Sequence, residues 1–286
     1  MIVTRFAPSP TGYLHLGHAF AALTAHDAAK AAGGRFLLRI EDLDTGRCRP
    51  EYETTIYQDL AWLGLCWKTP VLRQSARAAA YRKALAKLDA LALVYPCFCT
   101  RKEIAGEIAR SIEAPHGPEG FHYPGTCRAL PDAVRRERLT REPYALRLDV
   151  AKAAAITGML SFEEQGAGPH GERGTIIVNP ALFGDIVLAL KEMPAAYHLA
   201  VVVDDAFQGV TLVTRGNDLF AATHVQRLLQ ALLGLPVPVY AHHRLILDEH
   251  GKKFSKRDGA VTLRALRESG VTPGQIRARI MPPPYR

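Results

Sequence analysis

The first forty residues change hydrophobic period in a way that predicts a strand, a turn, a helix and a second strand. The four segments are alternating Met1–Phe6, proline-rich Ala7–Gly12, alanine-rich His15–Ala32 and apolar Arg35–Ile40. Gly33-Gly34 ends the helical pattern, as glycines commonly do. This succession is how an open parallel α/β sheet begins. Helical periods recur over residues 51–64 and 76–93.

The pattern changes between residues 95 and 145, where charges, three of the five cysteines and the Gly/Pro/His-rich piece Ala114–Gly125 gather. Short strand-like runs follow at Ala145–Val150, Thr175–Val178 and Ile186–Leu190. We therefore expect an inserted α/β module of about 100 residues with its own small core or metal.

Parallel-sheet patterning returns in the last third of the chain. The predicted elements are strands at Leu199–Val203, Val210–Val213, Val237–Tyr240 and Leu245–Leu247, a helix at Leu219–Leu233 and a helical tail over 262–282. The sequence thus predicts one Rossmann-type parallel sheet split by the insertion, with ligands at the carboxyl ends of its strands. The expected parts are residues 1–94, 95–194, 195–242 and 243–286.

Composition describes an ordinary globular protein, with 48% hydrophobic and 22% charged residues. No run approaches the roughly 20 apolar residues of a membrane span, and the N-terminus lacks a signal-peptide pattern. We expect a cytoplasmic monomer without membrane attachment. Five cysteines is an odd number, so a complete disulfide framework is not expected. Cys48 and Cys66 have no partner pattern and are expected to be free thiols.

The net charge of +8 is unevenly distributed, because residues 244–286 hold ten basic and four acidic residues. A basic tail on a nearly neutral body favours a polyanionic partner such as nucleic acid or a nucleotide phosphate. A solvated basic helix face is the alternative that composition leaves open.

The turn after the first strand carries the strongest local chemistry, Pro8-Ser9-Pro10-Thr11-Gly12-Tyr13-Leu14-His15-Leu16-Gly17-His18. The unpaired N–H groups and positive dipole end of the following helix attract phosphate. His15 and His18 are three residues apart and share one helical face, while Gly17 leaves room for a flat base or ribose. Two unrelated surface histidines remain the alternative.

A second cluster, Lys252-Lys253-Phe254-Ser255-Lys256-Arg257-Asp258-Gly259, places cations around a serine. Such a loop would stabilise a polyphosphate and its leaving group, and a solvated basic loop is the alternative. A third cluster, Cys97-Phe98-Cys99 with Cys127, supplies three ligands for a tetrahedral zinc site. Buried thiols are the alternative there, and His122 or His116 would serve as a fourth ligand.

These strings together resemble the class I aminoacyl-tRNA synthetases. His15-Leu16-Gly17-His18 matches their HIGH signature, and Lys253-Phe254-Ser255-Lys256-Arg257 matches their KMSKS loop. The glutamyl group of that family is resembled by the longer strings Arg5–His18, Arg39–Asp44, Val203–Asp205 and Val213–Leu219.

The resemblance implies ATP-dependent activation of glutamate, with Mg²⁺ accompanying ATP. It implies ATP contacts from His15, Gly17, His18, Lys253, Ser255 and Lys256. His15, His18 and Lys256 would be catalytic, Lys256 by stabilising the transition state. Glutamate would be bound by Arg5, Phe6, Ala7, Pro8, Ser9, Glu41, Tyr197 and Arg215. Structural ion pairing is the alternative for Arg5, Glu41 and Arg215, and ion pairing or capping is expected for Asp42, Asp44, Asp204 and Asp205.

Only 29 residues follow Arg257, so we expect the anticodon-binding domain of a full glutamyl enzyme to be absent. The chain therefore resembles the short glutamyl-queuosine group, which transfers glutamate to queuosine at the wobble position of tRNA(Asp). In that group a tyrosine four residues before the last cysteine is the fourth zinc ligand, which implies Tyr123. The stretch between Cys99 and Tyr123 is longer than usual. The rivals are a tRNA(Glu) ligase without an anticodon domain, a non-catalytic RNA-binding paralogue and a small-molecule nucleotidyltransferase.

Overall fold

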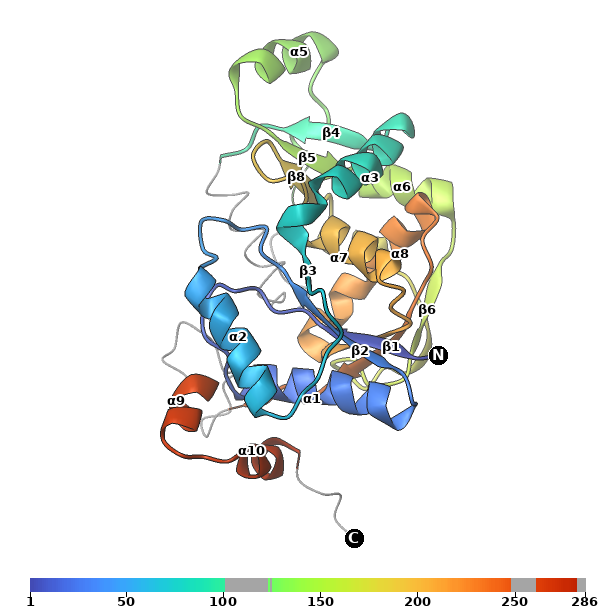
Figure 1. Ribbon diagram of the computed structural model, residues 1–286. Helices are drawn as coiled ribbons and strands as arrows, with labels where there is room; N and C mark the ends of the chain where they lie inside the picture. The colour runs from blue at the N-terminus through green and yellow to red at the C-terminus, as the bar shows by residue number, and fades with distance from the viewer. Residues whose placement is uncertain (101–122, 124, 248–260, 282–286) are drawn as a thin grey trace. The chain divides into compact units, whose positions relative to one another are not determined.

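The computed structural model describes residues 1–100, 123, 125–247 and 261–281 (Figure 1). The chain divides into two compact units. Unit 1 contains Met1–Ala76, Val210–Asn217 and Tyr240–Arg286, and unit 2 contains Arg77–Gly209 and Asp218–Val239. The four-part division expected from the sequence stays a prediction. No helix in the described ranges combines the length and apolarity that a bilayer span requires.

Unit 1 is built on a parallel sheet in the order β1-β2-β3, with β1 at Val3–Phe6, β2 at Arg35–Ile40 and β3 at Leu72–Arg73. The register of β1 and β2 runs from Val3 opposite Arg35 to Phe6 opposite Leu38. β9 (Leu212–Gly216) lies beside β1, where the Thr211 amide donates to the Val3 carbonyl at 3.0 Å. β9 in turn neighbours β10 (Val239–His243). The predicted strand–turn–helix–strand opening and its parallel sheet are confirmed.

The helix α1 (Leu16–Ala31) connects the first two strands. Its small alanines let it approach the sheet closely, while Leu16, Phe20 and Leu23 fill the shared core. After the helix, Gly34 passes so close to the first strand that a Cβ there would lie 2.1 Å from the Ile2 carbonyl oxygen. Only glycine fits this return into β2.

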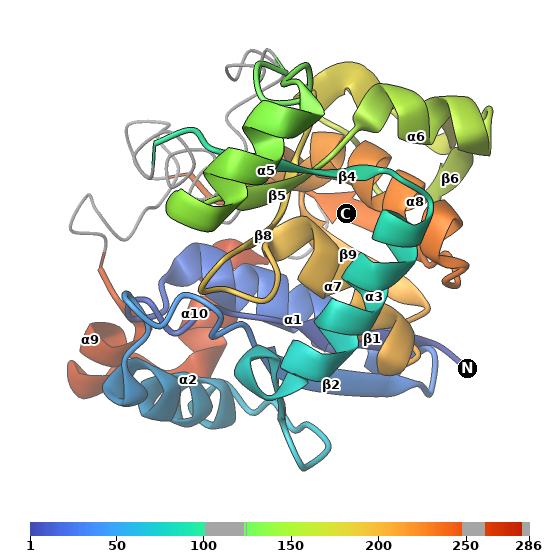
Figure 2. The same cartoon turned by 90° about the horizontal axis from the view of Figure 1, so that it is seen from above.

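The described part of unit 1 contains three further helices (Figure 2). They are α2 (Pro50–Trp62), α9 (Leu263–Glu268) and α10 (Pro273–Ile280). Leu263, Ile276 and Ile280 are buried in the same core as α1 and α2. The predicted helical tail is confirmed, as two short helices.

Unit 2 contains an antiparallel sheet in the order β4-β5-β8 and a β6–β7 hairpin. Its strands are β4 (Val94–Cys97), β5 (Ala145–Leu148), β6 (Ser161–Glu164), β7 (Gly174–Ile177) and β8 (Val187–Leu190). Its α-helices are α3 (Ala78–Ala90), α5 (Asp132–Arg141), α6 (Val150–Thr157), α7 (Tyr197–Phe207) and α8 (Phe220–Leu233). Short 3₁₀ turns lie at Gln74–Arg77, Pro180–Phe183 and Asn217–Leu219.

Two predicted strands are wrong. Leu199–Val203 lies inside the helix α7, which is buried on nearly all sides, from His198 to Val202 and again at Asp204 and Asp205. A helix without a solvent face gives an unbroken apolar run, which periodicity cannot distinguish from a buried strand. Residues 245–247 form no strand. The strand predicted at Val210–Val213 begins two residues later.

Asp204 shows why unit 2 tolerates a fully buried carboxylate. Its two oxygens accept the Arg77 Nε–H at 3.1 Å and the Tyr81 hydroxyl at 2.6 Å. A buried charge is stable only when it is paired and hydrogen-bonded in this way. The ion pairing expected for Asp204 is confirmed.

We predict that Tyr81→Phe lowers the free energy of unfolding by about 1–3 kcal/mol, because a buried carboxylate loses a hydrogen-bond donor. Urea denaturation measures the change. Tyr57→Phe is the matched control, because the Tyr57 hydroxyl also donates to a carboxylate, Glu53, at 2.6 Å, but in a half-exposed position. We expect it to cost less than about 1 kcal/mol. Equal losses for the two variants would contradict the role of burial.

Candidate functional site

The N-terminus of α1 is capped by two histidines. His15 is the N-cap residue in extended conformation, and its Nδ1 accepts the Gly17 backbone N–H at 3.1 Å. The His15 backbone N–H donates in return to His18 Nδ1 at 3.2 Å. The two ring centroids lie 3.8 Å apart. Histidines thus take the places that serine and glutamate hold in an ordinary capping box.

This cap fixes the tautomer of both rings. Because each Nδ1 accepts a hydrogen bond, the neutral imidazoles carry their proton on Nε2, which is then the donor. Gly17 suits the same geometry, since a Cβ there would lie 3.1 Å from His15 Cε1, close enough that the His15 ring would have to shift by a few tenths of an ångström. The helix start therefore presents two oriented N–H donors at its positive dipole end, an arrangement suited to phosphate oxygens.

A segment from the C-terminal part of unit 1 lies directly beside this turn. Thr262 forms an antiparallel bridge with His15, and the Leu263 amide donates to the Leu14 carbonyl at 2.7 Å. Thr262 also caps α9 by accepting the Ala265 N–H at 3.1 Å. The predicted loop residues Lys253, Ser255 and Lys256 lie outside the described residues.

Two buried arginines stand on neighbouring strands of unit 1. Arg5, on β1, donates to the Thr214 carbonyl at 3.3 Å. Arg215, on β9, donates through Nε to His242 Nε2 at 3.0 Å, and its guanidinium lies 5.3 Å from the Tyr240 ring centroid. Both side chains are 6% exposed. The structure thus places these two predicted residues on adjacent strands, with Arg5 bonded to the residue before Arg215.

Glu41 and the turn residues join the same region. Glu41 directly follows β2, and its backbone N–H donates to the Pro8 carbonyl at 3.1 Å. Its carboxylate pairs with the fully buried Arg39 at 3.1 Å. Phe6 ends β1, and residues Ala7–Ser9 continue from it into the turn. Tyr197 belongs to unit 2, where it begins α7.

The remaining acidic residues of these strings have structural partners. Asp42 accepts the Ser75 backbone N–H at 2.8 Å and its hydroxyl at 2.6 Å. Asp44 pairs with Arg47 Nε at 2.5 Å. The expected ion pairing is confirmed for Asp44, whereas Asp42 accepts hydrogen bonds from Ser75.

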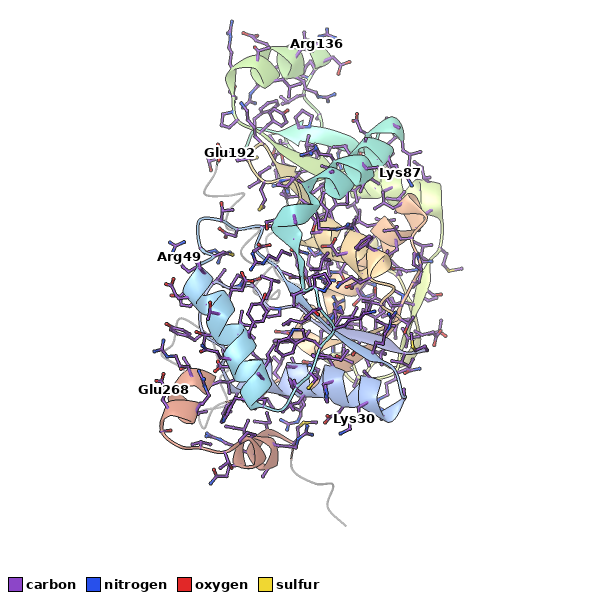
Figure 3. The ribbon with its side chains drawn as sticks, viewed as in Figure 1. Lys30, Arg49, Lys87, Arg136, Glu192 and Glu268 are labelled. Carbon is purple, nitrogen blue, oxygen red and sulfur yellow. The ribbon has the colours of Figure 1, made fainter. Side chains whose placement is uncertain are left out.

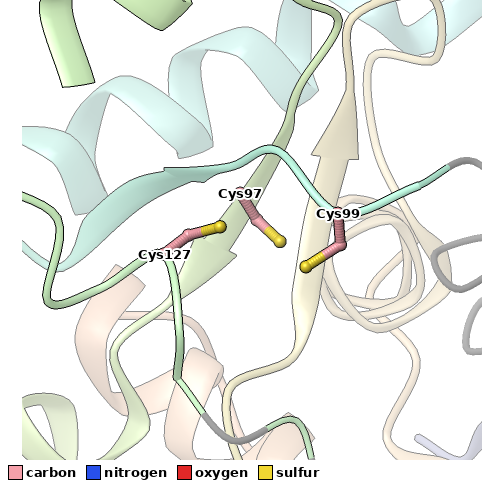
Figure 4. A group of neighbouring side chains, drawn as sticks. All are labelled: Cys97, Cys99 and Cys127. Atoms are coloured by element: carbon pink, nitrogen blue, oxygen red, sulfur yellow. The ribbon is translucent and has the colours of Figure 1, made fainter. Parts of the chain in front are cut away.

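Three cysteines of unit 2 point toward one another (Figure 4). The Sγ atoms of Cys97, Cys99 and Cys127 all lie within 4.8 Å of one another. The Tyr123 hydroxyl oxygen lies 3.3 Å from Cys97 Sγ and 3.5 Å from Cys99 Sγ, and it accepts the Cys127 amide at 3.0 Å. Three soft sulfur donors and one phenol oxygen around a common centre fit the four-ligand preference of zinc. The cluster predicted from spacing is therefore assembled in space.

Burial and mutual repulsion shape the acidity of this cluster. Burial raises the pKa of the Cys97 thiol, but hydrogen bonds from Tyr123, Cys99 and Arg147 outweigh it and leave that pKa lowered. Burial and the neighbouring thiols raise the pKa of Cys99 to about 12. Burial and hydrogen bonds to the thiols also raise the pKa of Tyr123. A divalent cation would reverse this balance by favouring the deprotonated donors.

Several residues that hold the site were assigned no role from the sequence. Arg39 pairs with Glu41, His242 accepts from Arg215, and Arg147 places its guanidinium 3.7 Å from the centroid of the Tyr123 ring. Each is a polar residue in or beside a strand that otherwise packs apolar groups. An arginine at a buried strand position is the kind of signal that would have indicated Arg39 and Arg147.

Comparison with known proteins gives one family over nearly the whole chain. Residues 1–281 match the family model described as tRNA synthetases class I (E and Q), catalytic domain. The chain is 52% identical over 283 residues to Glutamyl-Q tRNA(Asp) synthetase of Rhodobacter capsulatus, covering 98% of this chain and 99% of that one. It is 41% identical over 273 residues to Glutamate–tRNA ligase of Aquifex aeolicus, covering 95% of this chain and 55% of that one.

Solved structures agree. A glutamate tRNA ligase from Elizabethkingia meningosepticum, in complex with its amino acid, superposes with a TM-score of 0.70 at 31% identity, over 90% of this chain and 52% of that one. Glutamate-tRNA synthetase from Elizabethkingia anophelis gives 0.72 at 31% identity, over 90% and 53%. The chain spans about half the length of these solved relatives. The predicted fold class, a mixed α/β catalytic domain with a parallel sheet, is confirmed. The chain belongs to the class I (E and Q) tRNA synthetase catalytic-domain family.

Proposed function

We propose that this protein activates glutamate with ATP and transfers it to queuosine at the anticodon wobble position of tRNA(Asp). The observation that carries the proposal is the 52% identity to a relative named Glutamyl-Q tRNA(Asp) synthetase, of whose length 99% is covered. A glutamate ligase for tRNA(Glu) is the second candidate, supported by the 41% identity to a relative of that name.

Activation requires positioning and charge stabilisation. A carboxylate oxygen of glutamate attacks the α-phosphorus of ATP, and pyrophosphate leaves with the electrons of the broken P–O bond. Negative charge builds on the phosphate oxygens, so fixed donors nearby lower the barrier. We assign this role to His15 and His18, whose caps leave Nε2–H as the donor, while Gly17 keeps the helix start open to the nucleotide. Mg²⁺ would accompany the ATP phosphates.

Lys253, Ser255 and Lys256 are assigned to ATP by the sequence, with Lys256 stabilising the transition state. Chain connectivity is compatible with this role. Thr262 lies against His15, and Lys256 precedes it by six residues, a span of at most about 20 Å of extended chain.

Recognition of glutamate is assigned to the first strand and turn. Arg5 and Arg215 are buried cations, and a planar guanidinium suits a carboxylate better than an ammonium does. Glu41 is the assigned partner of the substrate ammonium group. Phe6, Ala7, Pro8, Ser9 and Tyr197 are assigned as further glutamate contacts.

We assign one structural zinc ion to Cys97, Cys99, Tyr123 and Cys127. When bound, the ion would cross-link β4 to the chain around Tyr123 and Cys127. The support for this assignment is the cluster of three cysteine sulfurs, with the Tyr123 hydroxyl within hydrogen-bond distance of two of them. The zinc has no part in the transfer step.

We predict that the purified protein transfers glutamate to tRNA(Asp) that contains queuosine and not to the same tRNA made without it. Filter assays with radiolabelled glutamate measure the difference, and tRNA(Glu) is the third substrate. Labelling of tRNA(Glu) alone would favour the second candidate. The absence of labelling and of glutamate-dependent ATP–pyrophosphate exchange would support a non-catalytic protein.

We predict that exchange proceeds with glutamate and ATP alone and that Lys256→Ala reduces its kcat by about 100-fold or more, as loss of a transition-state charge does. Lys30→Ala is the matched control, because Lys30 is an exposed lysine in the last turn of α1 (Figure 3). It should leave the rate unchanged. A Lys256→Ala enzyme with the normal rate would remove Lys256 from the mechanism.

We predict one zinc per chain in the purified protein, measured by plasma emission spectrometry. Cys99→Ser should lose most of the metal and lower the melting temperature, because a thiolate ligand is removed. Cys66→Ser removes an exposed thiol and should retain the full zinc content. Equal zinc in both variants would contradict the assignment.

A further inference from the structure

A buried carboxylate in α2 has no evident stabilising role. Asp59 is 0% exposed, and within the described chain neither of its oxygens takes part in a hydrogen bond. Arg267 of α9 faces it, with a terminal nitrogen 3.3 Å from Asp59 Oδ1. The same guanidinium donates to Gln58 at 3.4 Å. The α2–α9 contact is thus an ion pair that leaves the buried carboxylate poorly solvated.

Such a pair is a weak source of stability. Removing a carboxylate from water costs several kcal/mol, and attraction to one imperfectly placed cation seldom returns more than that. An apolar residue at position 59 would pack against α9 at a lower cost. A buried ion pair that adds little stability is better explained if function depends on the geometry that the pair imposes.

The helix α9 has six residues, of which Leu263 is buried. Leu266 packs against the same core, and Arg264 donates to the Tyr13 hydroxyl at 3.0 Å. At its first residue, the Leu263 N–H donates to the Leu14 carbonyl, and the preceding Thr262 bridges His15. In its last turn, Arg267 meets Asp59. Figure 1 shows α9 beside α2. The helix therefore links Asp59 to the backbone of His15.

We propose that Asp59 and Arg267 are a positioning pair for the activation step: their attraction orients α9 so that Thr262 and Leu263 hold His15 in place. The proposal rests on the assignment of His15 to ATP. Neither residue is catalytic, because both act through α9. Charge neutralisation at position 59 should therefore impair catalysis without weakening the fold.

The surroundings of Asp59 determine how the stability of the fold changes with pH. Burial raises the pKa of Asp59 to about 6. The charges of Arg267 and Arg264 lower this pKa, and the charge of Glu268 raises it, but burial is the largest effect. The folded chain therefore takes up this proton more readily than the unfolded chain, whose Asp59 has the ordinary pKa of 3.8. As the pH falls through about 6, the contribution of Asp59 to stability rises while the ion pair is lost. Positioning and stability thus change in opposite directions.

The test compares Asp59→Asn and Arg267→Leu with the unmodified enzyme in ATP–pyrophosphate exchange at pH 7.5. We expect kcat to fall about 10- to 100-fold in both, as displacement of a reacting group does, with the KM for glutamate unchanged. The double variant, Asp59→Asn with Arg267→Leu, should be no slower than either single variant, because each substitution removes the same ion pair. Arg267→Lys, which keeps a cation at a contact made through one nitrogen, should retain most of the rate.

A second readout is independent of activity. Amide hydrogen exchange at Leu263 reports its bond to Leu14, and we expect faster exchange in Asp59→Asn although its urea midpoint is unchanged or higher. The matched control is Asp27→Asn, which breaks the ion pair of Asp27 with Arg277 between α1 and α10, at 2.5 and 3.1 Å, on a more exposed surface. It should alter neither kcat nor the exchange of Leu263.

The outcomes separate the two proposals. If the unmodified enzyme shows no glutamate-dependent exchange, the proposed function fails, and Leu263 protection still decides whether Asp59 holds α9. Normal Leu263 protection and normal kcat in Asp59→Asn would overturn the positioning role. A lower urea midpoint in Asp59→Asn, in step with lower kcat, would also overturn it by showing a structural role.

Discussion

The start of α1 is the point on which the candidate site depends. A helix begins with backbone N–H groups that lack intrahelical acceptors, and here the His15 ring accepts one of them. Nδ1 of both histidines accepts a hydrogen bond in the cap, which orients the two rings, and a side chain at position 17 would crowd the His15 ring. Because the turn before it follows β1 and Thr262 pairs with His15, distant segments of unit 1 meet at one helix end.

Buried charge is the second organising feature of unit 1. Arg5, Arg39 and Arg215 are all at most 6% exposed, which is costly for cations without partners. Their contacts include the Thr214 carbonyl, the Glu41 carboxylate and the His242 ring. These contacts hold the three guanidinium groups in the interior of unit 1.

The cysteine cluster of unit 2 follows a different logic, because it is assembled from near and distant sequence. Cys97 and Cys99 lie at and just after the end of β4, while Tyr123 and Cys127 follow the long intervening stretch. The Tyr123–Gly184 bridge and the Arg147 guanidinium then hold the phenol in place. A small module with few apolar layers gains most from such a cross-link.

The sequence alone determined the opening α/β unit and the helices with clear periodicity, and it indicated the candidate site residues, because period, capping and spacing are local properties. It predicted the wrong structure at Leu199–Val203, since a run that is buried on all sides has no period to report. It had no means of indicating that His242 would support Arg215 or that Arg267 would reach Asp59. Those partners are separated by 27 and 208 positions, and only the packing of strands and helices brings their charges together. Local patterns specify elements and donor groups, whereas burial and pairing of charge depend on the neighbours that the folded chain supplies.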